Sequence, residues 1–324
     1  MITAYCVREG ALTGVPVAPD GTLPPDTIWI DVLRPSETED DLVESALGIA
    51  IPTRDEMIEI EPSSRLRLEK GAIYLTGSLV CNSEDERPTL SAVTFILARH
   101  RLVTLRYDEP KPFRLVTAEL GRACPADMTG ERLLMELLDT IVDRAADIIE
   151  RLAAQIEALS ERIFDREART DQNQRYRALL ARIAQLGDLA SKVRESLVSM
   201  ARIFTFLAAE GELKAMSKDQ KTALKSLQRD ATSLTDHVSY LGDKITFLLD
   251  ATLGLVSIEQ NNIIKIFAVL SVVLMPPTLI ASIYGMNFEH MPELALTWGY
   301  PAALIAMLIA AIVPYWIFKW RRWL

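Results

Sequence analysis

One face of a predicted helix carries small and polar residues through a segment of the chain that is otherwise strongly apolar. Alternating steps of four and three residues give the ten positions of this polar stripe: Asp250, Gly254, Ser257, Asn261, Ile264, Ala268, Ser271, Met275, Thr278 and Ser282. A period of 3.5 residues keeps one face of a helix turned towards the axis of a supercoiled bundle. Polar side chains on such a face could line a water-filled path, and Ile264, Phe267 and Met275 could form a hydrophobic constriction in it.

The stripe also has a purely structural interpretation, because small residues allow spanning helices to pack closely. Asp250 and Asn261 favour the path, since they continue the same face below the apolar segment, where close packing needs no such groups. Pro276 and Pro277 lie inside the segment, and each removes an amide donor from the helix. We therefore expect a kink or a polar opening there.

A second set of candidate residues follows the stripe directly, in Gly285, Met286 and Asn287. A ring of neutral amide oxygens from Asn287 could bind the waters of a hydrated ion, which suits a hard cation that loses its water reluctantly. The alternative is a helix C-cap, a position that suits Asn. Glu289 and Glu293 come next and would attract cations weakly at the mouth of the path.

Two apolar segments, residues 263–284 and 297–318, must position these groups. Each is about 22 residues long, which is enough to cross a hydrocarbon core of about 30 Å. One such hairpin cannot enclose a pore, so several copies must surround an axis, with the first helix inside and the second against lipid. Positive residues lie near the start of the first span, at Lys265, and after the second span, at Lys319, Arg321 and Arg322. The loop between the spans has no Lys or Arg, so the positive-inside rule predicts that both termini are cytoplasmic.

Composition excludes several other classes of function. The chain has 324 residues and a formal net charge of −9, which argues against nucleic acid as a partner. Its three cysteines and three histidines lack metal-ligand spacing, and no phosphate-binding loop is present. We find no set of residues for nucleophilic or acid–base catalysis, and we predict neither an enzyme nor an organic cofactor.

The first 128 residues predict an α+β domain in the cytoplasm. Runs rich in Val, Ile, Thr and aromatic residues predict largely antiparallel strands at Ile2–Val7, Thr27–Val32, Ala72–Val80, Leu90–Leu97 and Leu102–Tyr107. Capping boxes at Ser36 and Thr53, each with a Glu three residues later, predict two helix starts.

Long helices follow from Thr129. A seam for another helix repeats at steps of four and three residues through Leu134, Leu138, Ile141, Ala145, Ile148, Leu152, Ile156, Leu159 and Ile163. A second helix is expected from Gln172 to Ala209, and a third from near Ser217 into the membrane. The predicted division is an α/β domain (1–128), a helical coiled-coil hairpin (129–216), a stalk helix with the first span (217–284), a loop (285–296), the second span (297–318) and a basic tail (319–324).

The C-terminal region resembles the CorA family of magnesium transporters. The resemblance rests on Tyr284-Gly285-Met286-Asn287-Phe288, Met291-Pro292-Glu293-Leu294, Trp298 and the tail Lys319-Trp320-Arg321-Arg322-Trp323-Leu324. It implies a funnel-shaped homopentamer in a bacterial-type inner membrane, with Gly285, Met286 and Asn287 as the selectivity filter. It also implies that Asn261, Ile264, Met275 and Thr278 face the pore and that Asp250 lies at its inner end.

By the same resemblance, Mg²⁺ is both the transported ion and the regulatory ion, and cytoplasmic Mg²⁺ keeps the pore closed. We expect influx of Mg²⁺, and also of Co²⁺ or Ni²⁺, down the electrochemical gradient. A zinc or cobalt transporter of the same superfamily, with or without proton coupling, is the alternative. A membrane-anchored coiled-coil scaffold would explain the long helices but neither the stripe nor the loop motif.

Overall fold

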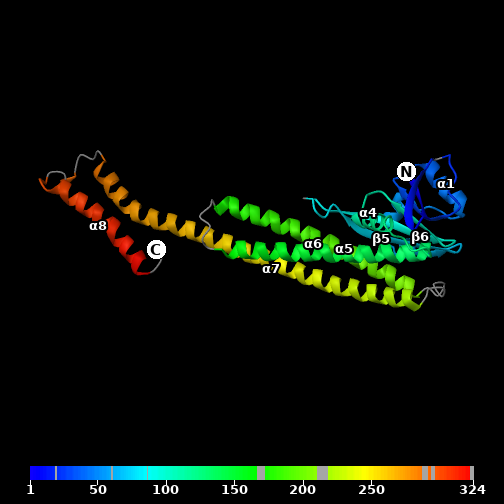
Figure 1. The fold of residues 1–324 in the computed structure, drawn as a ribbon. Coiled ribbons are helices and arrows are strands. Elements are labelled where there is room, and N and C mark those ends of the chain that lie inside the picture. The colour runs from blue at the N-terminus through cyan, green and yellow to red at the C-terminus, as the bar shows by residue number, and fades with distance from the viewer. Residues whose placement is uncertain are drawn as a thin grey trace. The chain divides into compact units, whose positions relative to one another are not determined.

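The computed structural model describes residues 1–18, 20–59, 61–85, 87–165, 172–209, 218–286, 291–292 and 296–321 (Figure 1). The chain divides into two compact units, Met1–Leu249 and Asp250–Leu324. Helix α7 (Lys218–Tyr284) contributes residues to both units. The six-part division expected from the sequence stays a prediction.

A seven-stranded sheet forms the centre of the first unit, in the order β2-β1-β3-β7-β6-β5-β4. Its strands are β1 (Ile2–Arg8), β2 (Ala11–Val17), β3 (Thr27–Leu33), β4 (Leu66–Glu69), β5 (Ala72–Cys81), β6 (Thr89–Ala98) and β7 (Arg101–Arg106). All neighbours pair antiparallel except β3 and β7, which are parallel. The five predicted strands are confirmed, whereas the two edge strands β2 and β4 were not expected.

Short helices cover one face of the sheet: α1 (Glu37–Leu47), α2 (Arg54–Ile58) and α3 (Pro62–Arg65). Val43 and Leu47 of α1 and Met57 of α2 are buried in one cluster with sheet residues such as Tyr74 and Ile96. Both predicted capping boxes are confirmed. Glu39 accepts the N–H of Ser36 at 3.0 Å, and Glu56 accepts the N–H of Thr53 at 2.8 Å.

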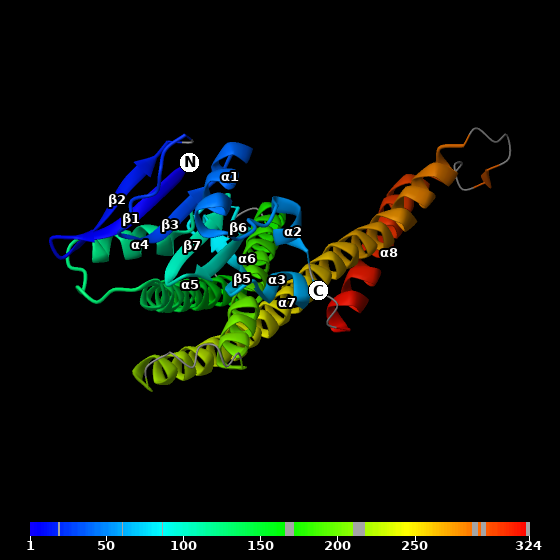
Figure 2. The same ribbon diagram turned by 90° about the vertical axis from the view of Figure 1, so that its right-hand side faces the viewer.

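Longer helices cover the other face: α4 (Lys111–Leu120), α5 (Gly130–Phe164) and α6 (Gln172–Ala209). Figure 2 shows α1 and α5 on opposite sides of the sheet. Phe113 of α4 packs on Trp29 and Phe95, with ring centroids 6.2 and 6.3 Å apart. The α6 helix reaches β5 at Gly77, where an added Cβ would lie 2.3 Å from the side chain of Met200.

The predicted seam of α5 is confirmed, because all nine of its residues are buried. The α5 and α6 helices lie side by side, and the first part of α7 runs along them (Figure 1). Lys244 of α7 forms an ion pair with Glu157 of α5, and Gln228 of α7 donates to Thr205 of α6 at 3.3 Å. Leu224, Leu227, Val238 and Leu241 of α7 are buried in this bundle.

The second unit contains the end of α7 and helix α8 (Gly299–Trp320). Both helices are long and apolar enough to cross a membrane, and almost none of either apolar stretch is covered by other parts of the chain. Trp316 and Trp320 are 71% and 83% exposed. Such apolar surface requires lipid or other copies of the chain to cover it.

Candidate ion pathway

All ten residues of the polar stripe are exposed on α7. The two largest, Ile264 and Met275, are 63% and 68% exposed. The α7 helix is unbroken from Lys218 to Tyr284, so a single regular element carries the whole stripe.

A different face of α7 is covered within the second unit. Val269 is only 8% exposed, and Val273, Pro276, Pro277 and Ile280 are half-buried. None of these five residues belongs to the stripe. The steps between them are four, three, one and three residues, so all five lie on one side of the helix. This spacing is visible in the sequence, but our sequence analysis did not identify the covered face.

The α8 helix has a matching half-buried face. It consists of Gly299, Ala302, Ala303, Met307, Ala310, Ala311, Pro314 and Phe318. The α8 helix runs back along the end of α7 (Figures 1 and 2), and alanines on one face allow close approach of two helices. We infer that α8 packs against the Val269–Ile280 face, which leaves the polar stripe uncovered by the described residues of the same chain.

Pro276 and Pro277 continue the helix but cannot donate backbone hydrogen bonds. The carbonyls of Val272 and Val273, one turn earlier, therefore lose their helical donors. The hydroxyl of Thr278 donates to the carbonyl of Leu274 at 2.8 Å, so it does not replace those donors. The helix is unbroken at this level, and the predicted polar opening at these two carbonyls stays a prediction.

The α7 helix ends where the loop motif begins. Gly285 donates its N–H to the carbonyl of Ala281 at 2.9 Å, and Met286 donates to Ile283 at 3.2 Å. An added Cβ at Gly285 would lie 3.1 Å from the Ala281 oxygen, which favours glycine at this position. Three other predicted site residues, Asn287, Glu289 and Glu293, lie outside the described residues.

The charged groups of the second unit are few. Asp250 is exposed at its first residue, and Lys265 is exposed on α7 fifteen positions later. Within the described part of one chain, no three His, Cys, Asp or Glu side chains group closely enough to hold a metal ion. The stripe carries one carboxylate, that of Asp250, and its other side-chain oxygens belong to hydroxyl and amide groups.

An α/β unit, a long helix with an exposed polar stripe and a second apolar helix together are the features of a membrane transport protein. The family described as "CorA-like Mg2+ transporter protein" matches residues 25–321. The chain belongs to this CorA family, whose members are transporters and not enzymes.

Known relatives agree with this assignment over the whole length. The chain is 36% identical over 324 residues to the magnesium transport protein CorA of Salmonella typhimurium, covering 100% of both proteins. The solved structure of the CorA magnesium transporter from Methanocaldococcus jannaschii shares the fold at 20% identity, with a TM-score of 0.73 over 98% of this chain and 97% of that chain.

A more distant likeness is to the cytoplasmic domain of ZntB from Vibrio parahaemolyticus. It has a TM-score of 0.54 and 10% identity, over 78% of this chain and 96% of that chain. This comparison supports the fold of the first unit alone.

Proposed function

We propose that this chain forms an oligomeric channel that carries Mg²⁺ across a membrane into the cytoplasm, with α7 lining the pore and α8 facing lipid. The observation that carries the proposal is the exposure of the whole polar stripe on α7, while the half-buried residues from Val269 to Ile280 lie on a different face of the helix. The relatives named as magnesium transport proteins support Mg²⁺ as the cargo. A homopentamer, as the family resemblance implies, would turn five stripes towards one axis.

The membrane potential is sufficient to drive the movement. Moving one elementary charge through 100 mV releases about 2.3 kcal/mol, and a divalent ion releases about twice that amount. Lys319 lies in the last turn of α8 and Arg321 directly follows the helix. The positive-inside rule therefore predicts that both termini are cytoplasmic. Influx then follows the electrical gradient and needs no fuel.

The roles of the individual residues follow from their positions along the path. Gly285, Met286 and Asn287 form the selectivity filter, where the amide oxygen of Asn287 accepts hydrogen bonds from the waters of the hydrated ion. Ile264 and Met275 form apolar constrictions that close the path by dewetting. Asn261 and Thr278 line the pore, Asp250 lies at its inner end, and Glu289 and Glu293 concentrate cations at its outer mouth.

Cytoplasmic Mg²⁺ also regulates the channel in this proposal. An ion can shift a closed–open equilibrium only if it binds the closed state more tightly. Within the described part of one chain, no three His, Cys, Asp or Glu side chains are grouped so as to hold a metal ion, and we propose that the regulatory sites form between subunits.

The test is uptake of Mg²⁺ into liposomes that contain the purified full-length protein and an entrapped fluorescent indicator. We expect the wild type to take up Mg²⁺. The uptake rate of Asn287→Ala should be at least about tenfold lower than that of the wild type, because a polar contact worth about 1.4 kcal/mol is lost. Asn262→Ala removes the same side chain one position away from the stripe and should retain the rate.

Two outcomes would contradict different parts of the proposal. Normal uptake by Asn287→Ala would move selectivity away from the loop and leave Asn287 as a helix cap. Failure of the wild type to conduct Mg²⁺, while Zn²⁺ or Co²⁺ crosses with or without a pH gradient, would support the alternative transporter class. Absence of any ion movement by a folded oligomer would support a scaffold.

A further inference from the structure

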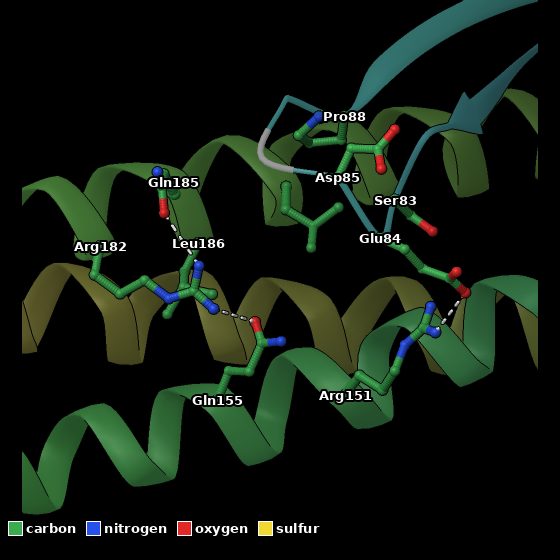
Figure 3. Close-up of a pocket in the computed structure, with 10 residues that line it drawn as sticks. Ser83, Glu84, Asp85, Pro88, Arg151, Gln155, Arg182, Gln185 and Leu186 are labelled. Carbon is green, nitrogen blue, oxygen red and sulfur yellow. Dashed lines mark hydrogen bonds and ion pairs between the residues drawn. The ribbon is translucent and has the colours of Figure 1, made fainter.

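The first unit contains a polar pocket far along the chain from the predicted pore residues. Its volume is about 240 Å³, and it lies between the β5–β6 loop, α5 and α6 (Figure 3). The polar lining residues are Ser83, Glu84, Asp85, Arg151, Gln155, Arg182 and Gln185, and the apolar ones are Pro88, Leu186 and Leu189. A water molecule occupies about 30 Å³ in the liquid, so this pocket is larger than a single ion needs.

Arg182 is held across the pocket by two neutral groups. Its Nη2 donates to the side-chain oxygen of Gln155 at 3.0 Å, and its Nη1 donates to that of Gln185 at 3.1 Å. These amides fix the guanidinium plane without neutralising its charge. Figure 3 shows the guanidinium extending from α6 towards Gln155 on α5.

The second guanidinium of the pocket belongs to Arg151, which shares its carboxylate partner with other cations. Glu84 Oε1 accepts from Arg151 at 3.1 Å, from Lys111 at 2.8 Å and from Arg144 at 2.8 Å. These three donors lower the pKa of Glu84 to about 2. One carboxylate therefore faces three positive groups, and part of the positive charge around it remains uncompensated.

The other charged groups near the pocket limit the charge of its ligand. Arg144 has a weak second partner in Asp147 at 3.4 Å, and Lys192 pairs with Asp188 at 2.6 Å. Asp85 also lines the pocket, and Glu86 lies outside the described residues. Arg151 is engaged by Glu84 of the loop, whereas the two amide partners of Arg182 are neutral. A ligand must therefore place its negative charge at Arg182, away from the carboxylates of the loop.

We propose that this pocket binds a phosphate-bearing small molecule, with its phosphate oxygens on Arg182 and its organic part against Pro88, Leu186 and Leu189. The planar guanidinium fork matches two oxygens of a phosphate group, which a compact ammonium does not. The apolar wall and the volume favour a phosphomonoester over free inorganic phosphate. A bound ligand would contact the β5–β6 loop, α5 and α6 at the same time and so link these three elements of the first unit.

The test is isothermal titration of the full-length protein in detergent, in metal-free buffer at pH 7.5. Three probes distinguish binding of free phosphate from binding of a phosphomonoester: inorganic phosphate, phenyl phosphate and adenosine monophosphate. We expect saturable binding of the two phosphomonoesters and weaker binding of inorganic phosphate. Arg182→Gln should weaken binding by about tenfold or more, as expected for loss of a charge-assisted hydrogen bond.

Two further variants separate a built site from general charge attraction. Arg194→Gln removes the same charge from an exposed position of α6 outside the pocket and should leave affinity unchanged within about twofold. Arg182→Lys keeps the charge without the planar fork and should give an intermediate affinity. The unfolding temperature of each variant without ligand should match that of the wild type, because Arg182 and Arg194 lie at the surface.

Three results would overturn the proposal. They are the absence of saturable binding of every probe at millimolar concentration, an equal loss of affinity in Arg194→Gln and Arg182→Gln, and unchanged affinity in Arg182→Gln. None of these measurements depends on ion flux, so the proposal can fail while the channel function stands.

Discussion

Arg106 binds both carboxylate oxygens of Asp31, with Nη2 to Oδ2 at 2.7 Å and Nε to Oδ1 at 3.0 Å. The pair joins β7 to β3, the parallel neighbours of the sheet. Both side chains are almost fully buried, at 10% and 6% exposure. Thr104 also donates to Asp31 at 2.7 Å and accepts from the indole of Trp29 at 2.9 Å, so the buried carboxylate has a full set of partners.

We predict that Arg106→Met lowers the free energy of unfolding by about 3–5 kcal/mol, because it leaves the carboxylate of Asp31 buried without its counter-charge. Urea unfolding followed by tryptophan fluorescence measures the change. Arg8→Met is the control, since Arg8 and Asp26 form an exposed pair at 3.6 Å and its loss should cost less than about 1 kcal/mol. Equal effects of the two variants would show that burial of the Asp31 pair is unimportant.

Gly130 is predicted to tolerate no side chain. A Cβ there would lie 2.6 Å from the backbone nitrogen of Leu102 and 2.7 Å from the carbonyl oxygen of His100, and neither backbone atom can move freely. Gly130→Ala should therefore destabilise the protein by about 1–3 kcal/mol. Gly242→Ala, at a helical position with nothing within 4 Å of the new Cβ, should instead stabilise it by about 0.5–1 kcal/mol. Thermal unfolding of both variants checks this opposite sign.

Asp40 is predicted to make stability fall as pH rises from about 4 to 6. Burial, followed by the nearby charges of Glu44, Glu39 and Asp41, raises its pKa to about 6, while the N-terminal amine opposes the shift. Its Oδ1 is buried without a hydrogen-bond partner among the described residues. The unfolded chain keeps a value of about 3.9, so the folded state binds the proton more tightly and loses that advantage as the proton leaves.

Asp40→Asn therefore should raise the unfolding temperature at pH 8 and have little effect at about pH 3.5, where Asp40 is largely protonated in both the folded and the unfolded state. Glu195→Gln removes an exposed carboxylate of α6 and should show no such pH dependence. A gain from Asp40→Asn that is the same at both pH values would rule out titration of Asp40 as the cause.

Cysteine substitution should test the proposed path along the polar stripe of α7. The natural cysteines Cys6, Cys81 and Cys124 are buried, and burial raises the pKa of each thiol, that of Cys81 to about 12. They should therefore react slowly. We predict that a charged thiosulfonate reagent blocks ion flux in Met275→Cys and Thr278→Cys, because thiolates form and react where water is present.

Leu274→Cys and Leu279→Cys provide the matched controls, since both positions are exposed on the same helix but lie off the stripe. Their modification should be at least about tenfold slower, as expected for thiols held in an apolar environment. Comparable rates at all four positions would contradict a path along the stripe.

Much of this fold follows from short-range patterns in the sequence. The seam from Leu134 to Ile163, the capping boxes at Ser36 and Thr53, and the two apolar segments each depend on residues within a few positions of one another, and all are present in the structure. The strands β2 and β4 were missed because they lie at the sheet edges, where Gly14, Pro16 and Arg67 weaken the usual strand signal.

The sequence alone determined that two apolar helices follow long amphipathic ones and that a polar stripe repeats along the first of them, because helical periodicity is a local property of the chain. Tertiary structure decided which face of α7 meets α8, that Arg106 meets Asp31 across β7 and β3, and that Arg182 meets Gln155 in one pocket. Each of these depends on the pairing of distant segments, which local periodicity does not specify.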